Sequence, residues 1–268
     1  MAKIQCDFKS KVLSKSMSMT VILPEESISS EYSSKKTYPV LYLLHGYSDD
    51  HTTWVRNTSI ERYAHDLGLA VVMPGMDNSY YTDMKYGGAY WTFLTEELPL
   101  LTQSFFPVTN DPMQTFAAGH SMGGFGVLKW GLSKPERFRA IASLSGVTDM
   151  AAHLENTRMQ SDDKSDQLSL IFGKEDIRKS QNDILWLLEN ASTNKRLPML
   201  YQTCGTEDFL YPLNVRFQKK CEALHLSAVH HFEKGDHTWD FWDQAIQRVL
   251  AWLPIHSGEE PEHHENKE

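Results

Sequence analysis

Six short apolar runs recur along this chain, separated by longer segments of mixed polarity. The runs cover residues 38–44, 67–75, 113–120, 139–146, 197–205 and 227–235. They are too short for helices and end at or beside a glycine, which is typical of strands buried on both faces of a sheet. Several of the intervening segments place apolar residues three and four positions apart, as amphipathic helices do. Alternating strands and helices predict an α/β fold around a mostly parallel sheet.

Two more strand-like runs, 3–8 and 17–23, predict an N-terminal hairpin, which brings the sheet to about eight strands with helices on both faces. Residues 1–254 are accordingly interpreted as one domain. The stretch from about 150 to 195 carries no strand signal and predicts a small helical cap over the carboxyl ends of the strands, where open α/β sheets bind ligands. The alternative is an insertion at the side of the sheet that contacts no substrate. Residues 255–268 are polar and charged, and they are predicted to form a disordered tail.

The charge balance excludes several classes of partner. With 35 acidic and 26 basic residues the net charge is −9 and no basic cluster occurs, so neither nucleic acid nor a membrane is an expected partner. The sequence shows no membrane span and no signal peptide, which predicts a cytoplasmic location. Cys6, Cys204 and Cys221 are widely spaced without a CxxC, so no metal or disulfide framework is expected. No cofactor is expected either, and the sequence leaves the oligomeric state open, with a homo-oligomer among the options.

The sequence Gly119-His120-Ser121-Met122-Gly123 follows one predicted strand and precedes a predicted helix. In that context a G-x-S-x-G pattern forms a sharp, strained turn that lifts the serine oxygen clear of the sheet. The turn also places the Met122 N–H at the start of a helix, where unpaired amides and the helix dipole favour an anion. Ser121 is therefore a candidate nucleophile; a purely structural Gly-Ser turn is the alternative.

A serine needs a base to become a nucleophile at neutral pH, and in folds with this motif the chain order is serine, acid, histidine. His237 follows the last predicted strand and is the expected base. Asp208 follows the run 197–205 and is the preferred acid. Asp149, after the run 139–146, is the alternative acid, and whichever carboxylate is unused would cap a helix.

An oxyanion that develops during attack needs two backbone N–H donors. Met122 would supply one. Tyr47, in the loop after the run 38–44, is the expected second donor, with Gly46 as the alternative. The glycine lets the backbone approach the substrate closely.

The loops after two strands contain further candidates for substrate contacts. Segment 76–91 is rich in aromatic residues and can wall an acyl pocket, although aromatic residues also simply pack. The candidate substrate-binding residues are Gly46, Trp54, Tyr81 and Trp91.

The motifs LLHGYSDDHTTW, GHSMGGFG, CGTEDFLY and GDHTWDFW, in this order, resemble the esterase D family of α/β hydrolases. Within that family the chain looks closest to the tributyrin esterases of lactic acid bacteria and streptococci. The resemblance extends from about the first strand to Leu253. It implies an α/β-hydrolase fold and a catalytic triad of Ser121, Asp208 and His237, which are also the residues preferred from the motif and the strand order.

The leading hypothesis is a serine carboxylesterase that hydrolyses short-chain acyl esters, with a small-molecule ester as its partner. A second hypothesis keeps the chemistry but changes the substrate to a thioester, as in S-formylglutathione hydrolases, or to an acetylated carbohydrate. The loop His45-Gly46-Tyr47-Ser48 differs from that of the formylglutathione hydrolases, which disfavours the thioester. A third hypothesis is a binding module without turnover, and the complete set of triad residues argues against it.

Overall fold

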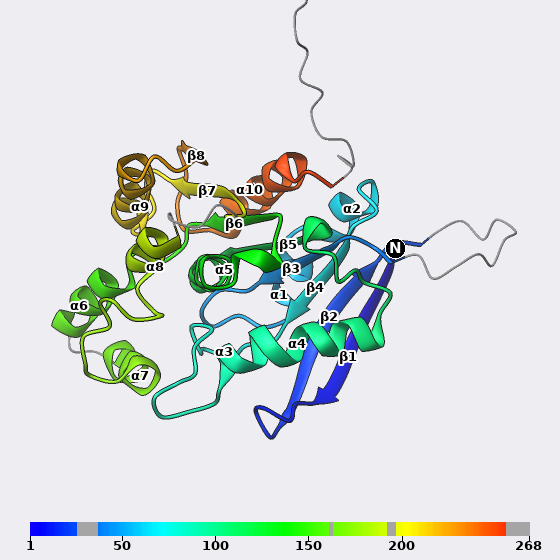
Figure 1. The fold of residues 1–268 in the computed structure, drawn as a ribbon, viewed down its shortest axis with the longest axis horizontal. Coiled ribbons are helices and arrows are strands. Elements are labelled where there is room, and N and C mark those ends of the chain that lie inside the picture. The colour runs from blue at the N-terminus through cyan, green and yellow to red at the C-terminus, as the bar shows by residue number, and fades with distance from the viewer. Residues whose placement is uncertain (26–36, 161–162, 192–196, 256–268) are drawn as a thin grey trace, which may run out of the picture.

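An eight-stranded mixed sheet forms the centre of the protein (Figure 1). The computed structural model describes residues 1–25, 37–160, 163–191 and 197–255. The spatial order of the strands is β1-β2-β4-β3-β5-β6-β7-β8. The sheet contains β1 (Ala2–Lys9), β2 (Ser16–Leu23), β3 (Val40–Leu44), β4 (Ala70–Pro74), β5 (Thr115–His120), β6 (Ala140–Leu144), β7 (Met199–Gly205) and β8 (Ala228–Glu233).

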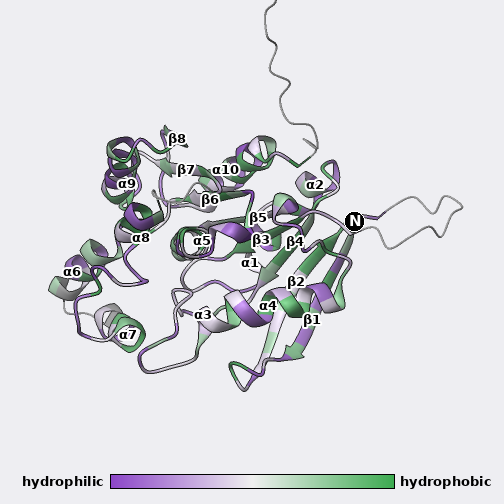
Figure 2. Cartoon of the chain, in the orientation of Figure 1, coloured by the Kyte–Doolittle hydropathy of each residue, from purple (hydrophilic) through white to green (hydrophobic). Residues whose placement is uncertain are grey.

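Strands β4, β3, β5, β6, β7 and β8 run parallel, whereas β1 and β2 form an antiparallel hairpin that joins the sheet through β2 and β4. This arrangement confirms the predicted α/β fold with a mostly parallel sheet. The edge strand β1 alternates half-buried and exposed residues, and Figure 2 shows its polarity alternating in the same way. The central strands β3, β4, β5 and β6 are buried along their whole length, as their continuous apolar runs predict.

Alternate residues of each central strand enter two separate cores, because successive side chains of a strand point to opposite faces. Tyr42 and Leu44 enter one core, and Leu41 and Leu43 enter the other. Helices cover both faces (Figure 1). The second core packs under α1 (Thr53–Asn57), α2 (Ile60–His65) and α10 (Trp239–Trp252). The first packs under α3 (Tyr90–Thr92), η1 (Phe93–Glu97), α4 (Leu98–Phe105), α5 (Met122–Ser133), α8 (Ile184–Ala191) and α9 (Tyr211–Ala223).

Within the insertion of residues 150–195, the described residues form the helices α6 (Met150–Gln160), α7 (Asp163–Phe172) and α8. Helix α8 packs against α5 and α9 and so belongs to the layer beside the sheet. Helices α6 and α7 lie farther out in Figure 1, and the end of α7 is joined to the aromatic segment 76–91. There the N–H groups of Lys85 and Tyr86 donate to the carbonyls of Ile171 and Leu170 at 2.8 and 2.9 Å. Only α6 and α7 are thus candidates for a cap.

The segment over residues 90–106 has the apolar spacing of a helix, and it contains a π-helical turn at η1 that this spacing did not reveal. Pro99, which has no N–H to donate, follows this turn at the start of α4. The turn positions Glu97, whose carboxylate accepts hydrogen bonds from Ser10 Oγ, Lys11 N and Val12 N in the β1–β2 connection. The π turn therefore fastens the hairpin to the helical layer.

Two features at the margins of the fold complete the description. Among the residues that the structure describes, no helix combines the length and the apolarity that a membrane crossing would require. The predicted disordered tail falls mostly on residues 256–268, which lie outside the described residues.

Candidate active site

Ser121 lies at the turn between β5 and α5, with the backbone angles φ 54° and ψ −117°. A residue with a side chain rarely adopts this conformation, which costs on the order of 1–3 kcal/mol. The turn is held by close packing: a Cβ added to Gly123 would lie 2.4 Å from the carbonyl oxygen of Leu44 on β3. The neighbouring strand therefore excludes any larger residue at Gly123, and the structure has the strained serine turn that the motif predicts.

Two hydrogen bonds link Ser121, His237 and Asp208. Oγ of Ser121 lies 3.0 Å from Nε2 of His237, and Nδ1 of the same ring lies 2.8 Å from Oδ2 of Asp208. The Asp208 side chain is fully buried, while 18% of the His237 side chain is exposed. Because a carboxylate only accepts, Nδ1 donates to Asp208, which leaves Nε2 free to accept the proton of the serine hydroxyl.

Asp208 and His237 come together because the loops after β7 and β8 are joined. Thr206 N donates to Glu233 O at 2.8 Å, and Glu207 N donates to Gly235 O at 2.9 Å. The second oxygen of Asp208 accepts from Leu210 N at 2.8 Å, which fixes the carboxylate before α9 begins. The orientation of the imidazole is thus set by backbone contacts between two adjacent strand ends.

The alternative acid, Asp149, has other partners. Its Oδ1 accepts from the backbone N–H of Ala152 in the first turn of α6, and its Oδ2 pairs with Arg216 at 3.1 Å. This carboxylate caps a helix and forms an ion pair, and no contact among those of the described residues joins it to His237.

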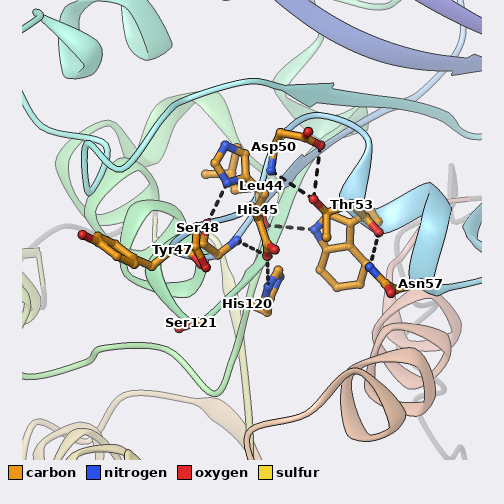
Figure 3. Close-up of polar contacts among 12 residues, drawn as sticks. Leu44, His45, Tyr47, Ser48, Asp50, Thr53, Asn57, His120 and Ser121 are labelled. Atoms are coloured by element: carbon orange, nitrogen blue, oxygen red, sulfur yellow. Dashed lines mark hydrogen bonds and ion pairs between the residues drawn. The ribbon is translucent and has the colours of Figure 1, made fainter.

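The predicted oxyanion loop, residues 45–48, follows β3 and approaches Ser121 (Figure 3). Met122 is the first residue of α5, where N–H groups have no carbonyl partner within the helix. The N–H of Gly46 donates to Asp49 Oδ2 at 3.2 Å and is therefore engaged within the loop. The choice between Tyr47 and Gly46 as the second donor stays a prediction.

Three of the four predicted substrate-binding residues lie in the core, which favours the alternative that these aromatic residues pack. Trp54 is 1% exposed and donates through Nε1 to Leu44 O, and Tyr81 is completely buried and donates through its hydroxyl to His45 O. Trp91 is 9% exposed and faces the ammonium group of Lys129. Their aromatic surface serves packing. The fourth residue, Gly46, is buried inside the loop.

Sequence reasoning missed a buried lysine that supports the aromatic segment. Lys129, on α5, is 0% exposed; its Nζ donates to Tyr81 O at 3.2 Å and to Thr82 Oγ1 at 2.8 Å. Burial lowers the pKa of Lys129 to about 7. Tyr80 and Tyr81 both have positive φ, at 48° and 52°, and Lys129 helps to hold this strained pair. In the sequence, Lys129 is a single charged residue within an otherwise apolar helical segment, and this pattern could have indicated a buried lysine.

A second missed feature is the pair of His120 and Asp49. The His120 ring is 1% exposed, and its Nε2 lies 2.9 Å from Asp49 Oδ2. The ring packs against Trp54, Trp239 and Trp242, with centroids 5.0, 4.6 and 4.3 Å away. Burial lowers the pKa of His120 to about 4, so the ring is neutral in the folded protein near neutral pH.

The neutral ring of His120 predicts a loss of stability in acid. Because its pKa is lower in the folded protein than the usual ~6.5 of an unfolded chain, the unfolded chain binds a proton first. The stabilisation is present above pH ~6.5 and is lost as the pH falls towards 4, by about 3 kcal/mol at most. We expect His120→Gln to flatten the dependence of the unfolding free energy on pH in this window, as measured by urea denaturation. Equal slopes for the variant and the parent would contradict this assignment.

The fold and the serine turn together define an α/β hydrolase. The family described as "Putative esterase" matches residues 10–253. An acetyl esterase of Caldicellulosiruptor saccharolyticus is 28% identical over 261 residues, which span 94% of this chain and 98% of that protein. The chain therefore belongs to this esterase family, the esterase D group of α/β hydrolases, and is a carboxylic ester hydrolase.

Solved structures agree with this assignment. Fluorophosphonate-binding serine hydrolase F (FphF) of Staphylococcus aureus superposes with a TM-score of 0.87 at 34% identity, covering 94% of this chain and 98% of that one. An S-formylglutathione hydrolase (FrmB) from the same organism gives a TM-score of 0.84 at 34% identity with the same coverage. A ferulic acid esterase shares the fold, with a TM-score of 0.78 at 24% identity.

Proposed function

We propose that this esterase hydrolyses short-chain acyl esters, such as those of tributyrin, with Ser121 as nucleophile, His237 as base and Asp208 as the supporting acid. The observation that carries the proposal is the pair of hydrogen bonds that joins these side chains, at 3.0 and 2.8 Å. The bonds give each group the partner that its role requires. Steady-state hydrolysis of 4-nitrophenyl acetate and tributyrin by the purified protein tests the activity directly.

The mechanism begins when His237 Nε2 takes the hydroxyl proton of Ser121 and the serine oxygen attacks the ester carbonyl. The buried carboxylate of Asp208 holds the ring through Nδ1 and stabilises the imidazolium that forms. The negative charge on the carbonyl oxygen is stabilised by the N–H groups of Met122 and Tyr47. His237 then protonates the departing alcohol, and water releases the acyl group from Ser121 by the same steps.

The short acyl preference is supported by an aromatic cluster beside the oxyanion loop. The Tyr47 ring lies 5.9 Å from that of Tyr80, which lies 6.0 Å from Phe125 and 5.7 Å from Phe172. Phe125 is one helical turn after Ser121 and donates its N–H to Ser121 O at 3.2 Å. The ring cluster thus extends from the oxyanion loop to the first turn of the helix that follows Ser121. Phe172 lies on helix α7. A second residue of this helix, Gln167, accepts a hydrogen bond from the Tyr47 hydroxyl, and this contact supports the interpretation of α7 as part of a cap.

The acyl preference predicts a definite chain-length profile. Each methylene that fits is worth about 0.8 kcal/mol, whereas one that does not fit costs strain. We expect kcat/KM on 4-nitrophenyl esters to peak between acetyl and butyryl and to fall steeply by about octanoyl. The Phe172→Ala variant should shift the maximum to longer chains by removing one ring of the cluster. A parent maximum at ten or twelve carbons would contradict the proposal.

A thioesterase activity is the second candidate, favoured by the 34% identity to the S. aureus S-formylglutathione hydrolase. The serine chemistry would be the same, and only the leaving group would differ. Comparing kcat/KM for S-formylglutathione with that for 4-nitrophenyl acetate separates the two. A preference of more than about 10²-fold for the thioester would replace the short-ester proposal. On sequence grounds we also propose that the enzyme acts in the cytoplasm on a small-molecule ester. The proposal specifies no oligomeric state.

A further inference from the structure

The peptide groups on both sides of Gly46 are held by side chains. The Gly46 N–H donates to Asp49 Oδ2 at 3.2 Å, and the Gly46 carbonyl lies 2.8 Å from His45 Nδ1. Nε2 of His45 accepts the Met76 N–H at 2.9 Å, so the ring proton is on Nδ1 and donates to Gly46 O. Both polar groups of this one residue are thus fixed before any substrate is bound.

The contact with His45 also sets the direction of the next N–H. In a planar trans peptide the carbonyl and the following N–H point in opposite directions. Because Gly46 O points at the His45 ring, the Tyr47 N–H points away from that ring. The direction of the proposed oxyanion donor therefore depends on the rotation of the Gly46 peptides, which Asp49 and His45 restrict from the two sides.

The same oxygen of Asp49 reaches the nucleophile elbow. Oδ2 accepts from His120 Nε2 at 2.9 Å as well as from Gly46 N, and His120 directly precedes Ser121 (Figure 3). Three tryptophan rings enclose His120, so this imidazole offers a rigid support. The fit leaves no spare room, because a Cβ on Gly46 would lie 2.6 Å from His120 Nε2.

We propose that Asp49 is a positioning residue for the oxyanion hole: its carboxylate ties the loop that carries the Tyr47 N–H to the elbow that carries Ser121 and the Met122 N–H. The inference rests on the proposed function of Ser121. The Asp49 carboxylate contacts Gly46 N and His120 Nε2, and in this proposal it acts by fixing the distance and angle between the two donors. A donor held in place before the reaction stabilises the oxyanion without reorganising.

Asp49→Ala removes the shared acceptor and should lower kcat about 10²-fold, the scale on which one oxyanion donor contributes, with KM within about threefold. Asp49→Asn keeps an oxygen that can accept both bonds, so its kcat should return to within about tenfold of the parent. Asp50→Ala is the matched control: its exposed carboxylate accepts from Thr52 N and pairs with Arg56, and its loss should change kcat less than about threefold.

A trifluoromethyl ketone supplies the specific readout, because it forms a tetrahedral oxyanion on the nucleophile. Its inhibition constant should rise for Asp49→Ala by about the same factor by which kcat falls, while the melting temperatures of Asp49→Asn and Asp50→Ala stay near the parent value. If Asp49→Ala does not fold, Gly46→Ala tests the same contact, because the added methyl group displaces the His120–Asp49 pair.

Three outcomes would overturn the inference: parent-like kcat in Asp49→Ala or, where that variant does not fold, in Gly46→Ala; equal losses for Asp49→Ala and Asp49→Asn; or an unchanged inhibition constant beside a lowered kcat. The proposed function fails by a different result, full activity of Ser121→Ala. A protein that needs Ser121 but not Asp49 would therefore refute only the positioning role.

Discussion

Replacing Ser121 with alanine is expected to lower kcat on a short ester by at least about 10³-fold while the protein folds normally. The hydroxyl oxygen is the atom that attacks, and no other hydroxyl is within reach of His237 Nε2 among the contacts of the described residues. The variant should also lose covalent labelling by a fluorophosphonate. Activity would be measured with 4-nitrophenyl acetate, and labelling by intact-protein mass spectrometry.

Ser145→Ala is a suitable control for this experiment. Ser145 is also a buried serine with positive φ, at 46°, directly after β6. Its loss should change kcat only a few-fold, because it is not joined to His237. If Ser121→Ala retains near-parental turnover or labelling, the mechanism is wrong.

Replacing Asp208 with asparagine is expected to lower kcat by on the order of 10⁴, the scale seen when a triad carboxylate is neutralised. The buried carboxylate accepts the Nδ1 proton of His237 at 2.8 Å, and an amide can present a donor there instead. The ring would then carry its proton on Nε2 and could not accept one from Ser121. Kinetics at saturating 4-nitrophenyl acetate would measure the loss.

Asp149→Asn is the matched control, since it neutralises the other acid considered for the triad. Its contacts with Ala152 N and Arg216 predict a loss of less than about tenfold in kcat, through weaker capping of α6. The reverse pattern, with a large loss only at Asp149, would transfer the acid role to the loop after β6.

The fold was predictable from sequence because the central strands are buried on both faces. Continuous apolar runs such as that in β3 have few alternatives to a place in a parallel sheet. Ser121 and His237 could be proposed because a glycine-flanked serine turn and a histidine after the last strand are local signals. Chain order could not separate Asp208 from Asp149, since both lie between Ser121 and His237 and each follows a strand. The family resemblance is what pointed to Asp208.

The environment of the aromatic residues was not predictable, because burial depends on contacts between segments far apart in sequence. From the sequence, Trp54 and Tyr81 could equally be ligand-binding or packing residues. In the structure, the Trp54 Nε1 donates to the carbonyl of Leu44 in β3, and the Tyr81 hydroxyl donates to the carbonyl of His45. In the sequence, Asp49 is one of two adjacent carboxylates in a loop, with nothing to distinguish it from Asp50. Its contact with His120 joins residues 71 positions apart, and no spacing rule relates them.

The joined loops after β7 and β8 also bear on how the enzyme acquires activity during synthesis. The nucleophile elbow lies near the middle of the chain, whereas the acid and the base come from the last two strands. A growing chain exposes its N-terminal part first and folds as its segments emerge. In the proposed mechanism, a ribosome-bound chain that ends before β8 has a serine with no base and cannot hydrolyse an ester. Ester hydrolysis would therefore indicate that the final strand has joined the sheet. A chain truncated before β8 would be inactive even if its first strands fold correctly.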